Sequence, residues 1–467
     1  MDKELSIEDP LIDKSSWQNK DIIDDSIPGI SLDKAYNTIL KNKKNKTIVV
    51  AVLDSPIDLC NRDIANNVWI NTKEIPNNAI DDDDNGYPDD IYGWNFLGDI
   101  THANYDYVRI VKRYQSIFEN KTERDIKPKD LDVFNNYLKA KSKYDKENDL
   151  GRRKSLYAIN IMKKDNEAKK ALSPFVKNNI YTIEKLNELD TIGNGLHKHV
   201  EQVKSLLKYE LTDQQLKQEF EKIQVDYNKR LNLNFNERTI NGDTPDNIND
   251  IHYRNNTVSS NLDLYTHGTG VSGVIVEKHN DTILTNNIKI MPVCISPFGD
   301  EHDKDIALGI RYAVDNGAKV INMSFGKEFS LYPKWVHDAL IYAEEHNVLI
   351  VSSCGNGWLN LNEVNDYYPN DNINNGKEVC DNFLLVGASS HLANENLKVS
   401  YSNYGTIDVD VFAPGGKIYT TYPNNEIKID SGTSLAAALT SKVAALIFSY
   451  YPNLSASQVK HIIMDSV

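Results

Sequence analysis

Short apolar runs recur on both sides of a long polar middle section of the chain. Those that predict β-strands are residues 48–53, 288–293, 319–323 and 348–351. Residues 305–316 and 335–346 carry amphipathic patterns that predict helices between the later runs, and the apolar run 443–447 predicts a buried helix. Short strands alternating with helices of about a dozen residues are typical of βαβ units. The pattern therefore predicts an α/β fold: a mostly parallel sheet with helices on both faces.

The polar middle section has a different pattern. It is rich in Lys, Glu and Asn, and between residues 180 and 207 its apolar residues recur at steps of three and four. This period predicts amphipathic helices, and Thr212 with Gln215 forms the capping-box pattern of another helix. The expected organisation is an N-terminal extension, the first part of the α/β domain, an all-α insertion and the second part of the α/β domain: residues 1–30, 31–98, 99–240 and 241–467.

Composition narrows the classes of function. A formal net charge of −15 argues against a nucleic-acid partner. No stretch approaches the roughly 18 apolar residues of a membrane span, and the polar N-terminus has no apolar core of a signal peptide. The cysteines are widely spaced and form no metal-ligand pairs, so we expect buried free thiols at Cys60, Cys294, Cys354 and Cys380.

Three residues with catalytic side chains occur in the order Asp, His, Ser. Asp54 ends the first apolar run, His267 lies among small residues, and Ser434 begins the predicted final helix. A histidine activates a serine hydroxyl as a general base, and a carboxylate orients that histidine. Each residue by itself also fits a structural role, as a turn former, a structural histidine or a small residue at a helix start. Together they predict a catalytic triad.

The segments Asp54-Ser55, His267-Gly268-Thr269 and Gly432-Thr433-Ser434 resemble the three motifs of the subtilisin-like serine proteases, the subtilases. The resemblance implies a three-layer subtilisin-like fold and a serine endopeptidase, with Asn356 and the Ser434 N–H stabilising the oxyanion. It also implies protein or peptide substrates. The residues that it places around the substrate are Ser324, Phe325, Gly326, Ser353, Cys354 and Gly355, with Cys354 near the specificity pocket, as part of its floor or as a reactive thiol.

Six aspartates crowd residues 80–90. The side chains of Asp81, Asp83 and Asn85 alternate, and glycine follows at the sixth position, as in the first part of an EF-hand-type calcium loop. Exported subtilases carry a similar acidic loop. We therefore expect a structural Ca²⁺ ion, with a solvated acidic turn as the alternative. The candidate ligands are Asp81, Asp83, Asn85, Tyr87, Asp89 and Asp90.

Several alternatives stay open at this level. The insertion is either a lid over the cleft or a passive helical addition. The enzyme is either a general endopeptidase or a processing protease of narrow specificity gated by the insertion, and a third alternative is an inactive binding protein with the same fold. The resemblance favours an extracellular or cell-envelope location, with a cytoplasmic one as the alternative. The oligomeric state is not predicted.

Overall fold

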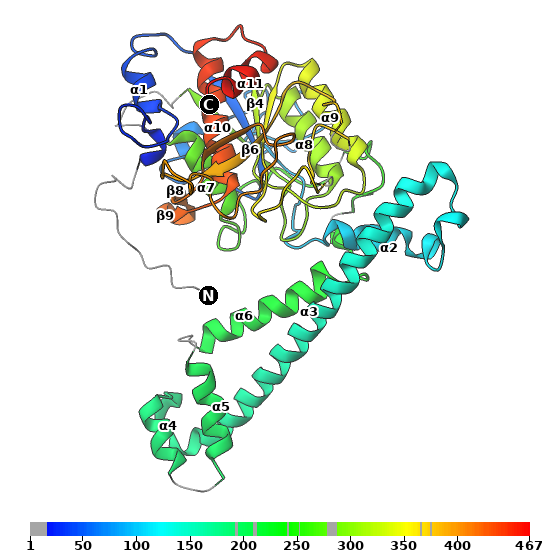
Figure 1. Ribbon diagram of the computed structural model, residues 1–467, viewed down its shortest axis with the longest axis vertical. Helices are drawn as coiled ribbons and strands as arrows, with labels where there is room; N and C mark the ends of the chain where they lie inside the picture. Colours follow the sequence, from blue (N-terminus) through cyan, green and yellow to red (C-terminus); the bar gives the residue numbers. More distant parts are fainter. Residues whose placement is uncertain are drawn as a thin grey trace. The chain divides into compact units, whose positions relative to one another are not determined.

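The computed structural model describes residues 16–191, 195–208, 213–240, 242–251, 253–277, 287–364, 367–373 and 376–467. It divides into two compact units, one formed by the residues up to Thr101 and from Arg238 to Val467, the other by His102–Glu237 (Figure 1). We call them the sheet unit and the helical unit. Thr212, half of the expected capping box, lies outside the described residues.

A parallel sheet forms the centre of the sheet unit. Across the described residues it has seven strands, in the order β2 (Trp94–Asn95), β3 (Ile288–Cys294), β1 (Ile48–Asp54), β4 (Val320–Met323), β5 (Leu349–Ser353), β6 (Phe383–Ser389) and β7 (Val411–Pro414). Every neighbouring pair is parallel. The sequence prediction of a mostly parallel α/β sheet is thus confirmed.

Alternate residues of β1 enter two different hydrophobic cores, because successive side chains of a strand point to opposite faces. Val50 and Val52 join the core that contains α7 (His267–Val276) and α10 (Thr433–Tyr450). Ala51 and Leu53 join the core with α8 (Asp303–Asp315) and α9 (Pro333–Glu345). Figure 1 shows these helix pairs on opposite sides of the sheet. The fold therefore has three layers, as expected.

Helix α10 departs from the expectation that no stretch resembles a membrane span. Its 18 residues have a mean hydropathy of 1.3, which is long and apolar enough by length and composition alone. However, 83% of the helix is buried, against β1 and β4 to β7 and against α7. Its apolar character is that of the central core helix.

Smaller elements complete the sheet unit. They are α1 (Leu32–Asn37), α11 (Ala456–Met464) and the antiparallel pair β8 (Ile418–Tyr422) and β9 (Glu426–Asp430). In the extension, the Trp17 side chain is buried in the α10 core and its indole N–H donates to the Lys417 carbonyl at 3.2 Å. The part of the extension around Trp17 is thereby packed onto the sheet unit.

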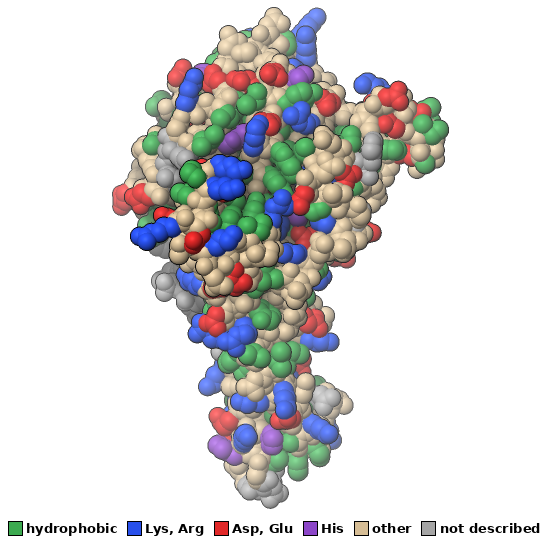
Figure 2. Space-filling view, turned by 90° about the vertical axis from the view of Figure 1, so that its right-hand side faces the viewer, with side chains coloured by type: hydrophobic (Ala, Val, Ile, Leu, Met, Phe, Trp, Pro, Cys, Tyr) green, Lys and Arg blue, Asp and Glu red, His purple; other side chains and the backbone are tan. Residues whose placement is uncertain are grey.

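The helical unit contains five α-helices in its described part: α2 (Asp106–Phe118), α3 (Leu131–Leu172), α4 (Ile183–Asp190), α5 (His197–Leu207) and α6 (Asp213–Val225). A small core joins the end of α3 to α4 and α5, where Leu172, Leu186 and Val200 are fully buried. Of the periodic apolar residues of 180–207, Leu186, Leu189, Leu196, Val200 and Val203 belong to this core, whereas Ile180 and Ile183 are exposed. Elsewhere hydrophobic side chains reach the surface among charged ones, as Figure 2 shows in its lower part.

The cysteines are all free in the structure, but not all are buried. Cys294, Cys354 and Cys380 are buried, whereas Cys60 is exposed, so the expectation is wrong for Cys60. The reason is local: Cys60 lies in a turn in which its N–H donates to the Asp58 carboxylate at 3.1 Å. Asx turns of this kind lie at the surface.

Candidate active site

The structure brings Asp54 and His267 together, although 213 residues separate them. His267 Nδ1 lies 2.8 Å and 2.9 Å from the two carboxylate oxygens of Asp54. Asp54 is buried, and it also accepts a hydrogen bond from the Ser55 N–H at 2.7 Å. The imidazole is open to solvent, with 47% of the side chain exposed. A buried carboxylate thus holds one nitrogen of an accessible imidazole.

This contact depends on a close approach between the end of β1 and the start of α7. A Cβ on Gly268 would lie 2.3 Å from the Ser55 carbonyl oxygen, so any side chain there would push the helix away from the strand. The Gly268 N–H donates to the Ser55 hydroxyl at 3.0 Å. The glycine after His267 therefore lets the imidazole reach Asp54.

Asp54 also sets the protonation of His267. Burial by itself lowers the pKa of the imidazole, but the charge and the hydrogen bond of Asp54 raise it, and the charges of Asp430 and Glu301 act in the same direction. The net pKa lies above its ordinary value of 6.5. The pair therefore makes a stronger base than a free histidine.

Ser434 is the second residue of α10 and belongs to a hydrogen-bond network with β4. Its hydroxyl donates to the Ser324 carbonyl at 3.0 Å, and the Ser324 hydroxyl donates back to the Ser434 carbonyl at 2.9 Å. Asn322 donates to the Ser324 hydroxyl at 2.9 Å and accepts from Ser441 at 3.0 Å. Within the described residues, the Ser434 hydroxyl makes no hydrogen bond to His267. The network fixes the start of α10 at the carboxyl end of β4.

Asn356 follows β5, and its side chain is oriented by Thr433. The amide oxygen accepts from both the backbone N–H and the hydroxyl of Thr433, each at 3.0 Å. The amide NH₂ group is therefore directed away from Thr433. A Cβ on Gly432 would lie 3.6 Å from Asn356 Nδ2 and 3.8 Å from the Ser434 backbone nitrogen. Two N–H donors thus flank a space that exists because residue 432 has no side chain.

The expected substrate-contacting residues follow the neighbouring parallel strands β4 and β5. The Cys354 side chain is buried in the core at the carboxyl end of β5, where its thiol donates to the Asn403 carbonyl at 3.2 Å. Burial raises the pKa of this thiol to about 12. Both properties are those of an unreactive cysteine. The remaining members of this set are Ser324, Phe325 and Gly326 after β4 and Ser353 and Gly355 at the end of β5.

The acidic loop brings three carboxylates together. Ligand oxygens of Glu74, Asp81 and Asp83 all lie within 4.8 Å of one another. One oxygen of Asp83 is buried without a hydrogen-bond partner, and only 5% of this side chain is exposed. The nearest cation that the structure records is the exposed Lys73 ammonium, 3.6 Å from the other Asp83 oxygen. Glu74 precedes the aspartate-rich segment and was not predicted from the sequence.

The other expected ligands make contacts within the protein. Asn85 Oδ1 accepts from the Tyr87 N–H at 2.8 Å, and Asp89 accepts from the Ala79 N–H at 2.7 Å. Asp90 is buried and accepts from Tyr312 at 2.6 Å. The Tyr87 ring packs in the core, edge-on to the rings of aromatic neighbours. The structure thus gathers Asp81 and Asp83 with Glu74. The contacts of Asn85, Tyr87, Asp89 and Asp90 instead hold the shape of the loop.

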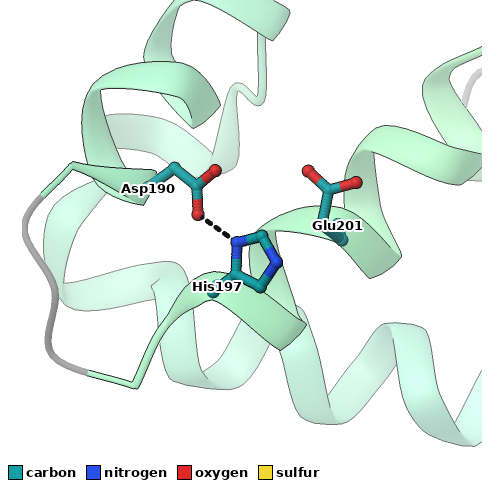
Figure 3. A group of neighbouring side chains, drawn as sticks. All are labelled: Asp190, His197 and Glu201. Atoms are coloured by element: carbon teal, nitrogen blue, oxygen red, sulfur yellow. Dashed lines mark hydrogen bonds and ion pairs between the residues drawn. The ribbon is translucent and has the colours of Figure 1, made fainter.

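A second group with metal-ligating side chains, Asp190, His197 and Glu201, joins α4 to α5 in the helical unit (Figure 3). His197 Nδ1 lies 2.7 Å from Asp190. The Lys204 ammonium lies 3.0 Å from Glu201 and 3.6 Å from Asp190, so it already offsets part of the charge of the two carboxylates. This arrangement is that of an ion-pair link between two helices.

The site also uses residues that sequence reasoning did not assign a role. Asn322, Gly432 and Thr433 were quoted only as parts of motifs, yet they hold or shape the positions around Ser434 and Asn356. The available signal in the sequence was a polar residue inside a motif segment expected to be buried. Such a residue needs a hydrogen-bond partner, and this requirement could have indicated a supporting role.

Comparison with known proteins places this geometry in a wider context. A model of the Subtilase family matches residues 45–467. The chain is 33% identical over 212 residues to the cell wall-associated protease of Bacillus subtilis (strain 168), covering 44% of this chain and 21% of that protein. It is 32% identical over 207 residues to subtilisin DY of Bacillus licheniformis, covering 44% of this chain and 70% of that protein. A solved lanthipeptide protease matches with a TM-score of 0.37 and 28% identity, over 43% of this chain and 67% of that one.

Proposed function

The chain belongs to the subtilase family, and from this premise we propose that it is a serine endopeptidase that uses Asp54, His267 and Ser434. The observation that carries the proposal is the Asp54–His267 pair, a buried carboxylate on an accessible imidazole, at the carboxyl end of the sheet, where Ser434 lies in the first turn of α10. Membership of the family and relatives named as proteases support it.

In the proposed first step, His267 Nε2 removes the proton of the Ser434 hydroxyl while the serine oxygen attacks the substrate carbonyl carbon. Asp54 keeps the proton on Nδ1 and stabilises the imidazolium. His267 then protonates the leaving amine, and an acyl-enzyme remains on Ser434. Water, activated by the same imidazole, hydrolyses this ester and restores the serine.

The mechanism requires one rearrangement of the structure described above. The Ser434 hydroxyl donates to the Ser324 carbonyl at 3.0 Å, so it must turn to His267 before it reacts. We propose that an entering peptide induces this change, because the edge formed by Ser324 and the residues after it offers backbone groups that pair with the substrate. Catalytic hydrogen bonds commonly tighten only in the complex.

The oxyanion would be held between Asn356 Nδ2 and the Ser434 N–H, in the space beside Gly432. The N–H groups of the first helical turn lack partners within the helix and favour negative charge. Removing one such donor typically costs about 2.7–4 kcal/mol of transition-state stabilisation. We therefore expect Asn356→Ala to lower kcat by a factor of 100 to 1,000, roughly, with little change in KM.

The decisive experiment is labelling with a fluorophosphonate, which reacts with activated serines. We expect labelling of the wild type and none of Ser434→Ala, because only an activated serine is phosphonylated. The matched control is Ser431→Ala, which removes an exposed serine three residues away. This variant must still be labelled, at Ser434. A folded wild type without labelling contradicts the proposal and favours a binding protein with this fold.

The breadth of specificity needs a separate measurement. A general endopeptidase cuts a denatured protein at many sites, and a processing enzyme cuts few. Digestion of a denatured protein, with the Ser434→Ala chain as the control for contaminating proteases, distinguishes the two. The proposed substrates in either case are proteins or peptides, and nucleic acid is not among them.

We also propose that Glu74, Asp81 and Asp83 hold a structural Ca²⁺ ion. Carboxylate oxygens are the ligands that calcium prefers, and the Asp83 oxygen that is buried without a hydrogen-bond partner supports cation binding at this cluster. The bound ion would neutralise the repulsion among these charges. Its contribution would be to the stability of the loop after β1, and no catalytic step involves it.

Calcium binding is measurable without activity. In a Ser434→Ala background, which prevents autolysis, we expect Ca²⁺ at 100 times its Kd to raise the free energy of unfolding by about 2.7 kcal/mol. Asp83→Asn should abolish this gain. Asp84→Asn removes the same charge from an exposed position of the same loop and should retain it. An equal effect of Ca²⁺ on both variants would contradict the site.

The location proposed for the enzyme is extracellular or on the cell envelope. A relative named as a cell wall-associated protease supports this. Fractionation of the native cell, followed by fluorophosphonate labelling of each fraction, tests it: labelling only in the cytosol contradicts it.

A further inference from the structure

The phenol ring of Tyr367 lies in a slot between two glycines. A Cβ on Gly326 would lie 2.2 Å from the Tyr367 hydroxyl oxygen, and one on Gly355 would lie 2.0 Å from the same atom. Both distances are far below any real contact of a Cβ atom. The hydroxyl therefore occupies space that exists only because both neighbours are glycines.

The slot lies at the carboxyl end of the sheet. Gly326 follows β4 and Gly355 follows β5, and these strands are parallel neighbours in the register Met323 to Ser352. Where two parallel strands end, their following segments diverge and leave a crevice, which is the usual ligand position in α/β sheets. Tyr367 comes from a separate segment and fills this crevice.

The reacting groups place the substrate over this slot. Ser434 is hydrogen-bonded to Ser324, two residues before one wall, and the proposed oxyanion donor Asn356 directly follows the other wall, Gly355. A carbonyl held between Ser434 and Asn356 therefore lies above the mouth of the slot. The side chain of the residue that carries this carbonyl is the substrate group nearest to the slot.

Tyr367 is held in place by packing. Its ring is partly buried against the core cluster of α8 and α9. In the described part of the chain, its hydroxyl has no hydrogen-bond partner. Burial, and then electrostatic interactions with Cys354, Glu301, Asp300 and Glu328, raise the pKa of Tyr367, so the phenol stays neutral. A neutral, packed ring reduces the volume of the slot without adding a charge to it.

We propose that Tyr367 determines specificity by filling this slot, so that the enzyme cleaves after small residues: glycine, alanine or serine. The inference rests on the proposed protease function and adds the substrate class. A bulky aromatic or branched side chain before the scissile bond would need the volume that the phenol ring already occupies. A pocket that excludes a side chain on size discriminates about tenfold or more for each methylene group.

The test is a set of fluorogenic peptides that differ only in the residue before the cleaved bond: Gly, Ala, Ser, Leu, Phe or Lys. For the wild type we expect kcat/KM for Ala or Ser to exceed that for Phe or Leu at least tenfold. Tyr367→Ala should raise kcat/KM for Phe at least tenfold and change that for Ala much less. Tyr367→Phe keeps the ring and should keep the wild-type preference.

The control is Tyr342→Ala, which removes a tyrosine from α9 whose hydroxyl donates to Asp315. It should leave the preference unchanged. A wild type that prefers Phe, Leu or Lys overturns the inference, as does a labelled Tyr367→Ala enzyme with an unchanged preference. Absence of both cleavage and fluorophosphonate labelling in the wild type instead overturns the proposed function, so the two failures are distinguishable.

Discussion

Two helices of this chain show how differently its two units are built. In α10 of the sheet unit, 15 of 18 residues are buried. In α3 of the helical unit, 8 of 42 residues are buried. The first helix is enclosed by a sheet and other helices, whereas the second carries exposed apolar residues such as Leu156, Tyr157 and Ile159. Tertiary packing therefore supports α10, and local interactions carry much more of the support of α3.

One ion pair from each unit illustrates the contrast between exposed and buried positions, although the helical unit also holds the buried pair Arg109–Asp106. In the helical unit, Arg152 and Asp149 pair one turn apart on α3 at 2.9 Å, and both are about half exposed. In the sheet unit, Arg238 makes two hydrogen bonds to Asp305 at 2.6 Å and 3.2 Å, and both side chains are buried. Exposed pairs contribute about 0–1 kcal/mol, whereas breaking a buried pair costs about 3–5 kcal/mol. A rigid site requires the second kind of environment, and the Asp54–His267 pair lies in that unit.

A matched substitution in each helix gives the largest expected difference. Leu439 of α10 is fully buried and Leu156 of α3 is 53% exposed. We expect Leu439→Ala to lower the free energy of unfolding of the sheet unit by about 2–5 kcal/mol. Leu156→Ala should change that of the helical unit by about 0.5 kcal/mol or less. Urea unfolding in a Ser434→Ala background measures both.

Two spectroscopic probes separate the units in that experiment. All five tryptophans lie in the sheet unit, so their fluorescence reports on it alone. Far-UV circular dichroism includes the long helices of the helical unit. Equal losses of unfolding free energy in Leu439→Ala and Leu156→Ala would contradict the conclusion that tertiary packing supports α10 much more than α3.

The oxyanion space provides the next effect in size. Gly432 has an extended backbone, with φ of 171°, so alanine is allowed there without strain. Its methyl group would enter the space between Asn356 and the Ser434 N–H. We expect Gly432→Ala to lower kcat by roughly 100-fold, about 2.7 kcal/mol, with both unfolding transitions unchanged. Unchanged kcat in a folded variant would show that the oxyanion does not lie there.

Thr433→Val tests the orientation of Asn356 with a smaller effect. Valine keeps the shape of threonine but removes the hydroxyl that donates to the Asn356 amide oxygen at 3.0 Å. The backbone N–H of residue 433 still donates to that oxygen. We therefore expect kcat to fall by about fivefold, since one of two orienting hydrogen bonds, worth about 1 kcal/mol, is lost. A larger fall than that of Asn356→Ala would show that Thr433 acts in another way.

The pH profile gives the smallest of these effects. The mechanism needs neutral His267, and Asp54 raises the pKa of this residue above 6.5. The rate must therefore rise with pH through a midpoint above 6.5 and fall as His267 is protonated at lower pH. The pH dependence of kcat/KM, or of fluorophosphonate labelling, measures this midpoint in the free enzyme. A midpoint at or below 6.5 would contradict the coupling to Asp54.

Much of the sheet unit was predictable because its strands are short apolar runs bounded by polar turns. The expected strand at 288–293 corresponds to β3, and the expected helix at 335–346 corresponds to α9, with ends that differ by one or two residues. Helix α3 was not predicted as an element, because its apolar residues form no continuous stripe and most of them stay exposed. The β8–β9 pair was also missed, since the exposed face of β9 includes Ile427 and Ile429.

The candidate site was predictable in its residue types and less so in its supports. Asp54, His267, Asn356 and Ser434 stand in motifs that carry their chemistry. Glu74 was missed because it lies outside the aspartate-rich segment and reaches the cluster only through the fold of the loop. Tyr367 had no signal in the sequence at all, because a tyrosine in a polar segment is ordinary until two glycines are found against its hydroxyl.

By itself, the sequence determined the strand and helix pattern of the sheet unit, the order of its catalytic motifs and the acidic loop, because these depend on residues close together along the chain. Only the tertiary structure decided which groups meet. Examples are the pairing of His267 with Asp54, the bond from Ser434 to Ser324 and the position of Tyr367. Such contacts join segments tens to hundreds of residues apart, and packing of the whole sheet and its helices sets their distances.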